Sequence, residues 1–68
     1  MAYVNRGIVL TRLDRYALAQ KDFDKAIQVN PDNARAYKAR GTLLKSLGKD
    51  DLANKDFEKA CELDRSLC

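Results

Sequence analysis

Three basic residues and a threonine follow one another at helical spacing in the middle of the chain. Arg35, Lys38, Thr42 and Lys45 are separated by three, four and three residues. On a helix they fall within an arc of about 80°, so three cations share one stripe. With no acid between them, they could hold a carboxylate or an acidic peptide. They could equally form an ordinary solvated face, because the chain has a net charge of +3.

Side chains suited to catalysis are scarce. The chain has no histidine. The pairs Asp22/Asp24 and Asp56/Glu58 look like paired carboxylates, but residues two apart point to different sides of a helix. We expect these acids to belong to a solvated charged face, interleaved with lysines at positions 21, 25, 55 and 59. We therefore predict no catalytic, cofactor-binding or metal site, and no enzyme activity.

The two cysteines, Cys61 and Cys68, are seven residues apart. On one continuous helix their Cα atoms would lie about 10.5 Å apart, too far for a disulfide. Without histidine they also give no zinc pattern. Two free thiols predict a cytoplasmic or other reducing compartment. No run of 18 apolar residues occurs, so we expect no membrane partner.

These side chains must be positioned by helices, since apolar residues recur at intervals of three, four and seven. We predict helices over residues 2–13, 17–29, 35–47 and 51–63. Gly48 is suited to a left-handed turn that ends the third helix, with Asp50 or Asp51 capping the fourth. Pro31 ends the second helix, and Asp32 or Asn33 can cap the third.

The chain repeats itself with a period of 34 residues. Residues 1–34 and 35–68 align without a gap and are identical at thirteen positions. A fixed period of this length is typical of a solenoid, whose units bury their apolar faces by stacking. Gly7 and Gly41 lie in the middle of predicted helices, where glycine is unfavourable. We therefore expect close helix approach there, with Phe23 packing on the bare backbone at Gly7.

This pattern resembles the tetratricopeptide repeat family over essentially the whole chain, as one domain of two repeats, 1–34 and 35–68. The matching scaffold positions are Tyr3, Gly7, Leu10, Ala19, Phe23, Ala26 and Pro31, followed by Tyr37, Gly41, Leu44, Ala53, Phe57 and Ala60. Three kinds of position depart from the motif. Arg6 and Arg40 replace leucine, and we expect their guanidinium groups to reach water. Leu10 and Leu44 replace a frequent tyrosine. Arg65 replaces the second proline, which indicates that the array ends there or that the last helix continues.

The resemblance implies an all-α solenoid of four antiparallel helices whose first helix in each unit lines a concave peptide groove. The implied groove residues are Val4, Asn5, Ile8, Arg12, Arg35, Lys38, Thr42 and Lys45. Met1, Thr11, Ala39 and Ser46 lie on the same face. The family's clamp for chaperone C-termini is incomplete, because Ala39 stands where its arginine belongs.

Three functions are compatible with these features. The first is a protein-interaction module that binds a peptide or partner helix, with an acidic ligand favoured by the cationic stripe. The second is head-to-tail self-assembly, in which the last helix of one copy stacks on the first helix of another. The expected contact surface joins Val9, Leu10 and Leu13 to Leu52, Cys61, Leu63 and Leu67. The boundaries of the two repeats suggest either such self-assembly or a fragment of a longer repeat protein. The third, nucleic-acid binding, is not expected, because thirteen Lys and Arg residues are interspersed with ten acids.

Overall fold

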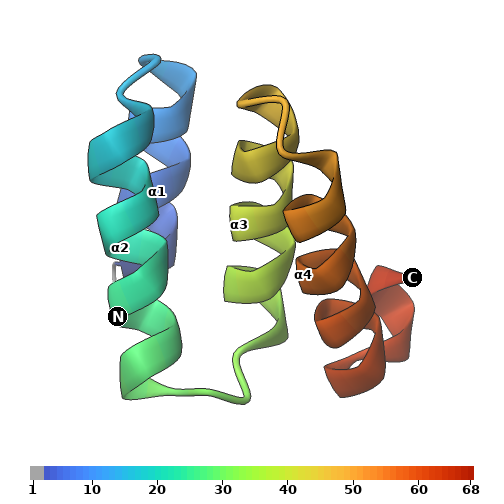
Figure 1. Cartoon of the computed structure of the whole chain (residues 1–68). Coiled ribbons are helices and arrows are strands. Elements are labelled where there is room, and N and C mark those ends of the chain that lie inside the picture. The colour runs from blue at the N-terminus through green and yellow to red at the C-terminus, as the bar shows by residue number, and fades with distance from the viewer. Residues whose placement is uncertain (1–2) are drawn as a thin grey trace.

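Four α-helices and a short 3-10 turn make up the computed structural model, which describes residues 3–68. The elements are α1 (Tyr3–Arg12), α2 (Tyr16–Val29), α3 (Ala34–Ser46), α4 (Asp50–Leu63) and the turn η1 (Arg65–Leu67). They form two antiparallel hairpins, α1–α2 and α3–α4, and α3 packs against the first hairpin (Figure 1). The predicted all-α fold is confirmed, and the predicted helix ends agree to within one residue among the residues described. Met1 and Ala2, which the sequence assigned to the groove face and the first helix, lie outside the described residues.

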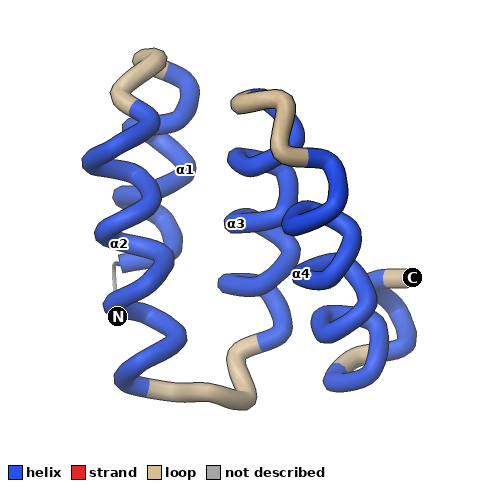
Figure 2. The backbone as a smooth tube through the Cα atoms, viewed as in Figure 1, coloured by secondary structure: helices blue, strands red, loops and turns tan. Residues whose placement is uncertain are grey.

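A short loop joins the two helices of each hairpin (Figure 2), and one residue of each loop has left-handed backbone. Gly48 has φ +77°, as predicted, and Asp14 takes the equivalent place in the first hairpin with φ 60°. The expected side-chain cap on α4 is wrong: Lys49 is its N-cap and makes no side-chain cap hydrogen bond. Asp50 and Asp51 lie in the first turn of α4 instead, where their charges favour the positive end of the helix dipole.

Asparagine side chains shape the loop between the hairpins. Asn30 ends α2 and accepts a hydrogen bond from the Asp32 backbone N–H at 3.1 Å. Asn33 caps α3 by accepting the Ala36 N–H at 3.2 Å, which confirms one of the two predicted caps. These bonds fix the direction in which the chain leaves one repeat and enters the next.

The same turn recurs after the second repeat, although Arg65 replaces proline there. α4 ends at Leu63, so the expectation that this helix continues is wrong. Asp64 has φ −149° and ψ 105°, close to the −141° and 93° of Asn30. Its carboxylate accepts the Ser66 N–H at 3.0 Å, as Asn30 accepts that of Asp32. The side chain of Asp64 therefore preserves the turn without proline.

This turn brings the two cysteines together, and Cys61 and Cys68 form a disulfide with their Cα atoms 4.7 Å apart. The prediction of two free thiols is wrong, because it assumed one continuous helix between the residues. The argument for a reducing compartment loses its support with the free thiols. Within residues 3–68, no helix has the length and apolar character that a membrane crossing requires.

Close packing inside each hairpin depends on glycine, as expected. A Cβ atom on Gly7 would lie 2.5 Å from the Phe23 ring, and one on Gly41 would lie 2.7 Å from the Phe57 ring. Phe23 is itself buried against Ala19 and Leu43, so the first hairpin and α3 share one core. Eight of the scaffold positions are buried: Gly7, Ala19, Phe23, Ala26, Gly41, Leu44, Ala53 and Ala60.

Candidate functional site

A hollow of about 340 Å³ lies between α1 and α3, with Phe23 of α2 and Leu67 of η1 also lining it. Five of its lining residues are apolar: Val4, Ile8, Phe23, Ala39 and Leu67. The other five are basic or carry a hydroxyl: Thr11, Arg12, Arg35, Lys38 and Thr42. No acidic residue lines it within the described chain. The hollow therefore combines an apolar surface with three cations.

Six of the eight residues predicted for the groove line this hollow: Val4, Ile8, Arg12, Arg35, Lys38 and Thr42. Asn5 lies beside it, in a smaller depression shared with Val4, Asn33 and Arg35. Lys45 is exposed in the last turn of α3 and lines neither depression. The cationic stripe read from helical spacing is thus divided, with Arg35 and Lys38 at the hollow and Lys45 beyond it.

Sequence reasoning missed two contributors to this surface. Phe23 was assigned to the scaffold only, but it also lines the hollow. Leu67 reaches the hollow because the turn after α4 directs η1 back toward α3. The 34-residue period pairs Leu67 with Asn33, which the structure also places beside the first helix of its own repeat, but the sequence alone held no signal for this contact.

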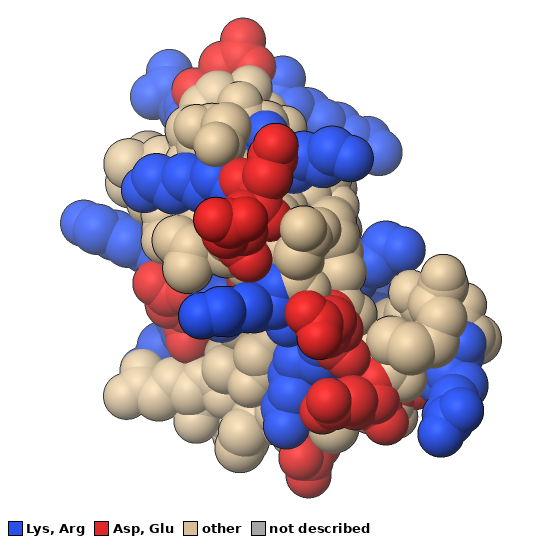
Figure 3. Space-filling view, turned by 45° about the vertical axis from the view of Figure 1, so that its right-hand side comes forward, with Lys and Arg blue, Asp and Glu red and all other residues tan. Residues whose placement is uncertain are grey.

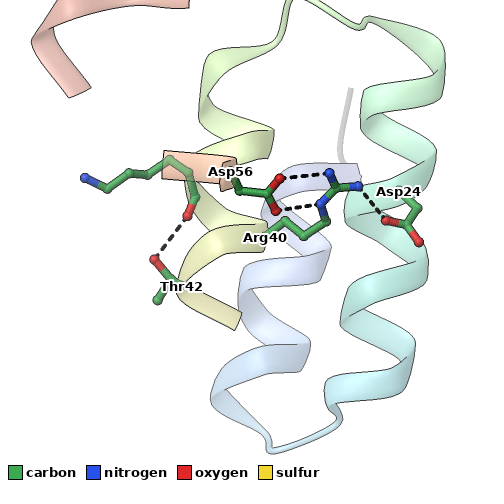
Figure 4. A network of polar contacts seen from close by, with 5 residues as sticks. Asp24, Arg40, Thr42 and Asp56 are labelled. Carbon is green, nitrogen blue, oxygen red and sulfur yellow. Dashed lines mark hydrogen bonds and ion pairs between the residues drawn. The ribbon is translucent and has the colours of Figure 1, made fainter. Parts of the chain in front are cut away.

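The two threonine hydroxyls do not offer hydrogen-bond donors to a ligand in this structure. Thr11 donates to the backbone carbonyl of Gly7 at 2.8 Å, and Thr42 donates to that of Lys38 at 3.1 Å (Figure 4). Their oxygens remain available only as acceptors. The positive charge at this hollow comes from Arg12, Arg35 and Lys38.

Lys38 lies at the junction of this hollow with a second, larger one of about 590 Å³. The second hollow lies along α4 and includes Phe57, Glu58 and the disulfide-bonded Cys61. The Lys38 ammonium lies 5.9 Å from the centre of the Phe57 ring, within the range of a cation–π contact. Lys38 can therefore face either hollow.

One arginine–aspartate pair connects the two helices of each hairpin, and these pairs correct two sequence interpretations. Arg6 donates two hydrogen bonds to Asp22, both of 2.8 Å, and Arg40 donates two to Asp56, of 2.8 and 3.0 Å. The guanidinium groups thus bind carboxylates rather than only reaching water. Asp22 and Asp56 are 7% and 6% exposed, so they do not belong to a solvated face.

Arg40 also connects the two repeats. Its Nη1 donates to Asp24 of α2 at 2.9 Å, while its other nitrogens bind Asp56 of α4 (Figure 4). Asp24 and Asp22 do point in different directions, as the spacing predicted, and each meets a different arginine. One guanidinium therefore joins both hairpins.

These contacts change the acid–base properties of the paired groups. The hydrogen bonds from Arg6 lower the pKa of Asp22 below its ordinary value of 3.8, although partial burial opposes the shift. The bonds to Asp56 and Asp24 raise the pKa of Arg40, so this arginine stays charged. The serine hydroxyl and backbone N–H of Ser66 lower the pKa of Asp64. Asp22 and Asp64 therefore stay ionised near neutral pH.

Outside the pairs, acidic and basic side chains are interspersed, as the face in Figure 3 shows. Residues 3–68 contain no group of three or more metal-ligating side chains that could hold an ion. The hollow between α1 and α3 has three cations and no acid among its own lining residues, and Lys38 also lines the second hollow with Glu58 and Glu62.

Comparison with known proteins agrees with the period and the geometry. No curated protein and no solved structure gave a match. A family model described as tetratricopeptide repeat matches residues 1–66. Repeats of this kind generally serve as non-catalytic modules for protein–protein interaction. With two hairpins in the expected order and a match over nearly its whole length, the chain belongs to the tetratricopeptide repeat family.

Proposed function

We propose that the chain binds a short peptide in the hollow between α1 and α3, and that the peptide carries an apolar side chain flanked by carboxylates. The observation that carries this proposal is the composition of the hollow: apolar residues together with Arg12, Arg35 and Lys38, and no acid among its described lining. An apolar peptide side chain would bury surface against Ile8 and Phe23. Its carboxylates would pair with the three cations, which are exposed before binding.

The test is a titration of a fluorescent peptide that alternates acidic residues with one leucine, followed by anisotropy. Arg12→Glu/Lys38→Glu should weaken binding by at least about tenfold, since both attractive contacts become repulsive. Lys25→Glu/Lys59→Glu makes the same change in net charge at exposed positions outside the hollow, and it should bind almost as wild type does. Equal loss in both variants would show only a general charge effect and contradict the groove assignment.

A second peptide separates the apolar contribution from the charge contribution. Replacing its leucine by serine should weaken binding by about tenfold, because a buried leucine side chain contributes roughly 1.5–3 kcal/mol. Unchanged affinity would contradict the role assigned to the apolar lining.

Self-association of the chain is a second candidate function, favoured by the different solvent exposure of two equivalent residues in the two repeats. Leu43 is 0% exposed because it packs on Ala19 and Phe23 of the first hairpin. Val9, its equivalent one repeat earlier, is 53% exposed. We propose that Val9 packs against the α4 side of a second copy in the way that Leu43 packs within the chain.

Sedimentation equilibrium from micromolar to millimolar concentration tests this second candidate. Val9→Glu should abolish association. Val29→Glu is the matched control, because Val29 is 61% exposed although the second repeat packs on α2, so stacking of the two repeats leaves this position uncovered. A wild-type chain that stays monomeric throughout, or equal effects of the two variants, would contradict self-association.

A further inference from the structure

The internal contact between the two repeats points to a specific recognition pair at the outer faces of the chain. We propose that Arg6 of one copy binds Glu58 of the next, and that this ion pair sets the direction and register of a head-to-tail stack. The inference rests on the self-association proposed above and adds the residues that select the partner surface.

The template for this pair is the bridge made by Arg40. Its guanidinium binds Asp56 of its own repeat and Asp24 of the preceding repeat, with Nη1 to the Asp24 carboxylate at 2.9 Å (Figure 4). The side chain of Arg40 is only 24% exposed, because the first hairpin covers it. The bridge therefore belongs to the contact by which one repeat recognises the next.

Half of this bridge is present at the face of α1. Arg6, the equivalent of Arg40, forms the same two hydrogen bonds within its repeat, to Asp22. Its side chain is 63% exposed, and within residues 3–68 its Nη1 makes no hydrogen bond or ion pair like that of Arg40. Asp22 thus holds the guanidinium in place with one nitrogen still free to bind a carboxylate.

The complementary half is present at the face of α4. Glu58 is the equivalent of Asp24, is exposed, and lines the hollow of about 590 Å³ beside Phe57 and Cys61. In the first repeat, the matching residue Phe23 receives Leu43 of α3. A second copy that placed its α1 on this hollow would bring its Val9 to Phe57 and its Arg6 to Glu58. Glu58 has one methylene more than Asp24, so its carboxylate has the reach that the pair requires.

The spacing within the chain fixes the register of this arrangement. Asp24 and Arg40 are sixteen residues apart. If the second copy continues the 34-residue period after residue 68, its Arg6 falls sixteen positions beyond Glu58. The same surface pair therefore occurs at every junction, and the two contacting faces differ from each other. A heterologous contact of this kind grows into an open stack unless the rotation between copies closes a ring.

Charge reversal on Glu58 tests the pair without disturbing the fold, because Glu58 is exposed and makes no hydrogen bond or ion pair within residues 3–68. Glu58→Arg should raise the dissociation constant of self-association by at least about tenfold, since it opposes two arginines. Asp32→Arg is the matched control, with the same charge change on the exposed loop between the hairpins, and should leave it unchanged. Association of Glu58→Arg as tight as wild type would overturn the pair while leaving self-association standing.

A second test mixes two charge-reversed variants and asks whether association is restored. The double variant Arg6→Glu/Asp22→Asn reverses the charge on α1 and also removes the Asp22 carboxylate, which would otherwise be buried without its arginine partner. Circular dichroism checks that this variant folds. This variant and Glu58→Arg should each associate poorly alone. Mixed in equal amounts they should associate more tightly than either one, because every junction then joins opposite charges. If the mixture associates no more tightly than each variant alone, the Arg6–Glu58 pair is wrong. If the wild-type chain is monomeric, both the pair and self-association are wrong.

Discussion

At the scale of single residues, the two arginine–aspartate pairs have the same hydrogen bonds but differ in how far the arginine side chain is exposed to solvent. Arg6 and Arg40 each form two hydrogen bonds to a largely buried aspartate, but the side chains are 63% and 24% exposed. The sequence identified both positions as departures from the family motif without identifying their partners. Spacing along one helix describes which residues share a face, whereas these pairs join residues of two different helices. Only the packing of α1 on α2 and of α3 on α4 brings them together.

A residue-scale prediction concerns Gly7. Gly7→Ala should destabilise the fold by up to about 2 kcal/mol, because overpacking against Phe23 costs roughly 1–3 kcal/mol while alanine's better helix propensity returns about 1 kcal/mol. Urea unfolding measures the change. In a Phe23→Leu background, which removes the ring that a Cβ would meet, the same substitution should be neutral or stabilising. The same destabilisation in both backgrounds would refute the close-approach explanation.

At the scale of elements, the helices were predictable and their ends were less so. Apolar periodicity and the residues Pro31 and Gly48 placed all four helices to within a residue where described. The error lay after Leu63, where the argument about the cysteines assumed one helix from Cys61 to Cys68, although the predicted helix ended at residue 63. The carboxylate of Asp64 forms the turn there, a role that depends on a side-chain hydrogen bond rather than on restricted backbone geometry. The missed disulfide and the missed Leu67 both follow from that one turn.

The corresponding element-scale prediction concerns the disulfide. Cys68→Ser should lower stability by up to about 2 kcal/mol, the amount expected from closing so short a loop. It should also weaken peptide binding, because Leu67 is no longer held at the end of the hollow. Calorimetry and the peptide titration with and without dithiothreitol measure both effects. Reductant should affect wild type but leave the Cys68→Ser variant unchanged. A wild-type chain indifferent to reductant would contradict the structural role of the disulfide.

At the scale of the whole molecule, the 34-residue period determined the architecture and the arrangement of most groove residues. Val4, Ile8, Arg12, Arg35, Lys38 and Thr42 meet because α1 and α3 are equivalent helices in adjacent repeats. Lys45 could not be separated from them by sequence, since helical spacing gives its place on the helix but not how far the hollow extends along that helix. Lys45 shares the angular stripe but lies at the other end of α3, outside the hollow.

The whole-molecule prediction is acid destabilisation through Asp22. Arg6 lowers the pKa of Asp22 in the folded chain below the 3.8 of an unfolded aspartate. Between the folded and the unfolded pKa of Asp22, the unfolded chain therefore binds more protons than the folded chain. The contribution of Asp22 to stability is present above about pH 4 and is lost as the pH falls through the folded pKa. Urea unfolding from pH 7 to pH 2 should show a shallower pH dependence for Asp22→Asn, together with lower stability at pH 7. Identical slopes for Asp22→Asn and wild type would contradict the role of the pair.

The turn at Asp64 also has a consequence for protein engineering. Because Asp64 has nearly the backbone angles of Asn30, we expect a chain continued beyond it to leave α4 in the direction in which α3 leaves α2. A helical segment fused genetically at Cys68 would be aimed at the hollow along α4 without a designed linker. Substituting Asp64 by alanine would remove that aim. The Asp64 carboxylate thus sets the direction in which an attached module would leave the chain.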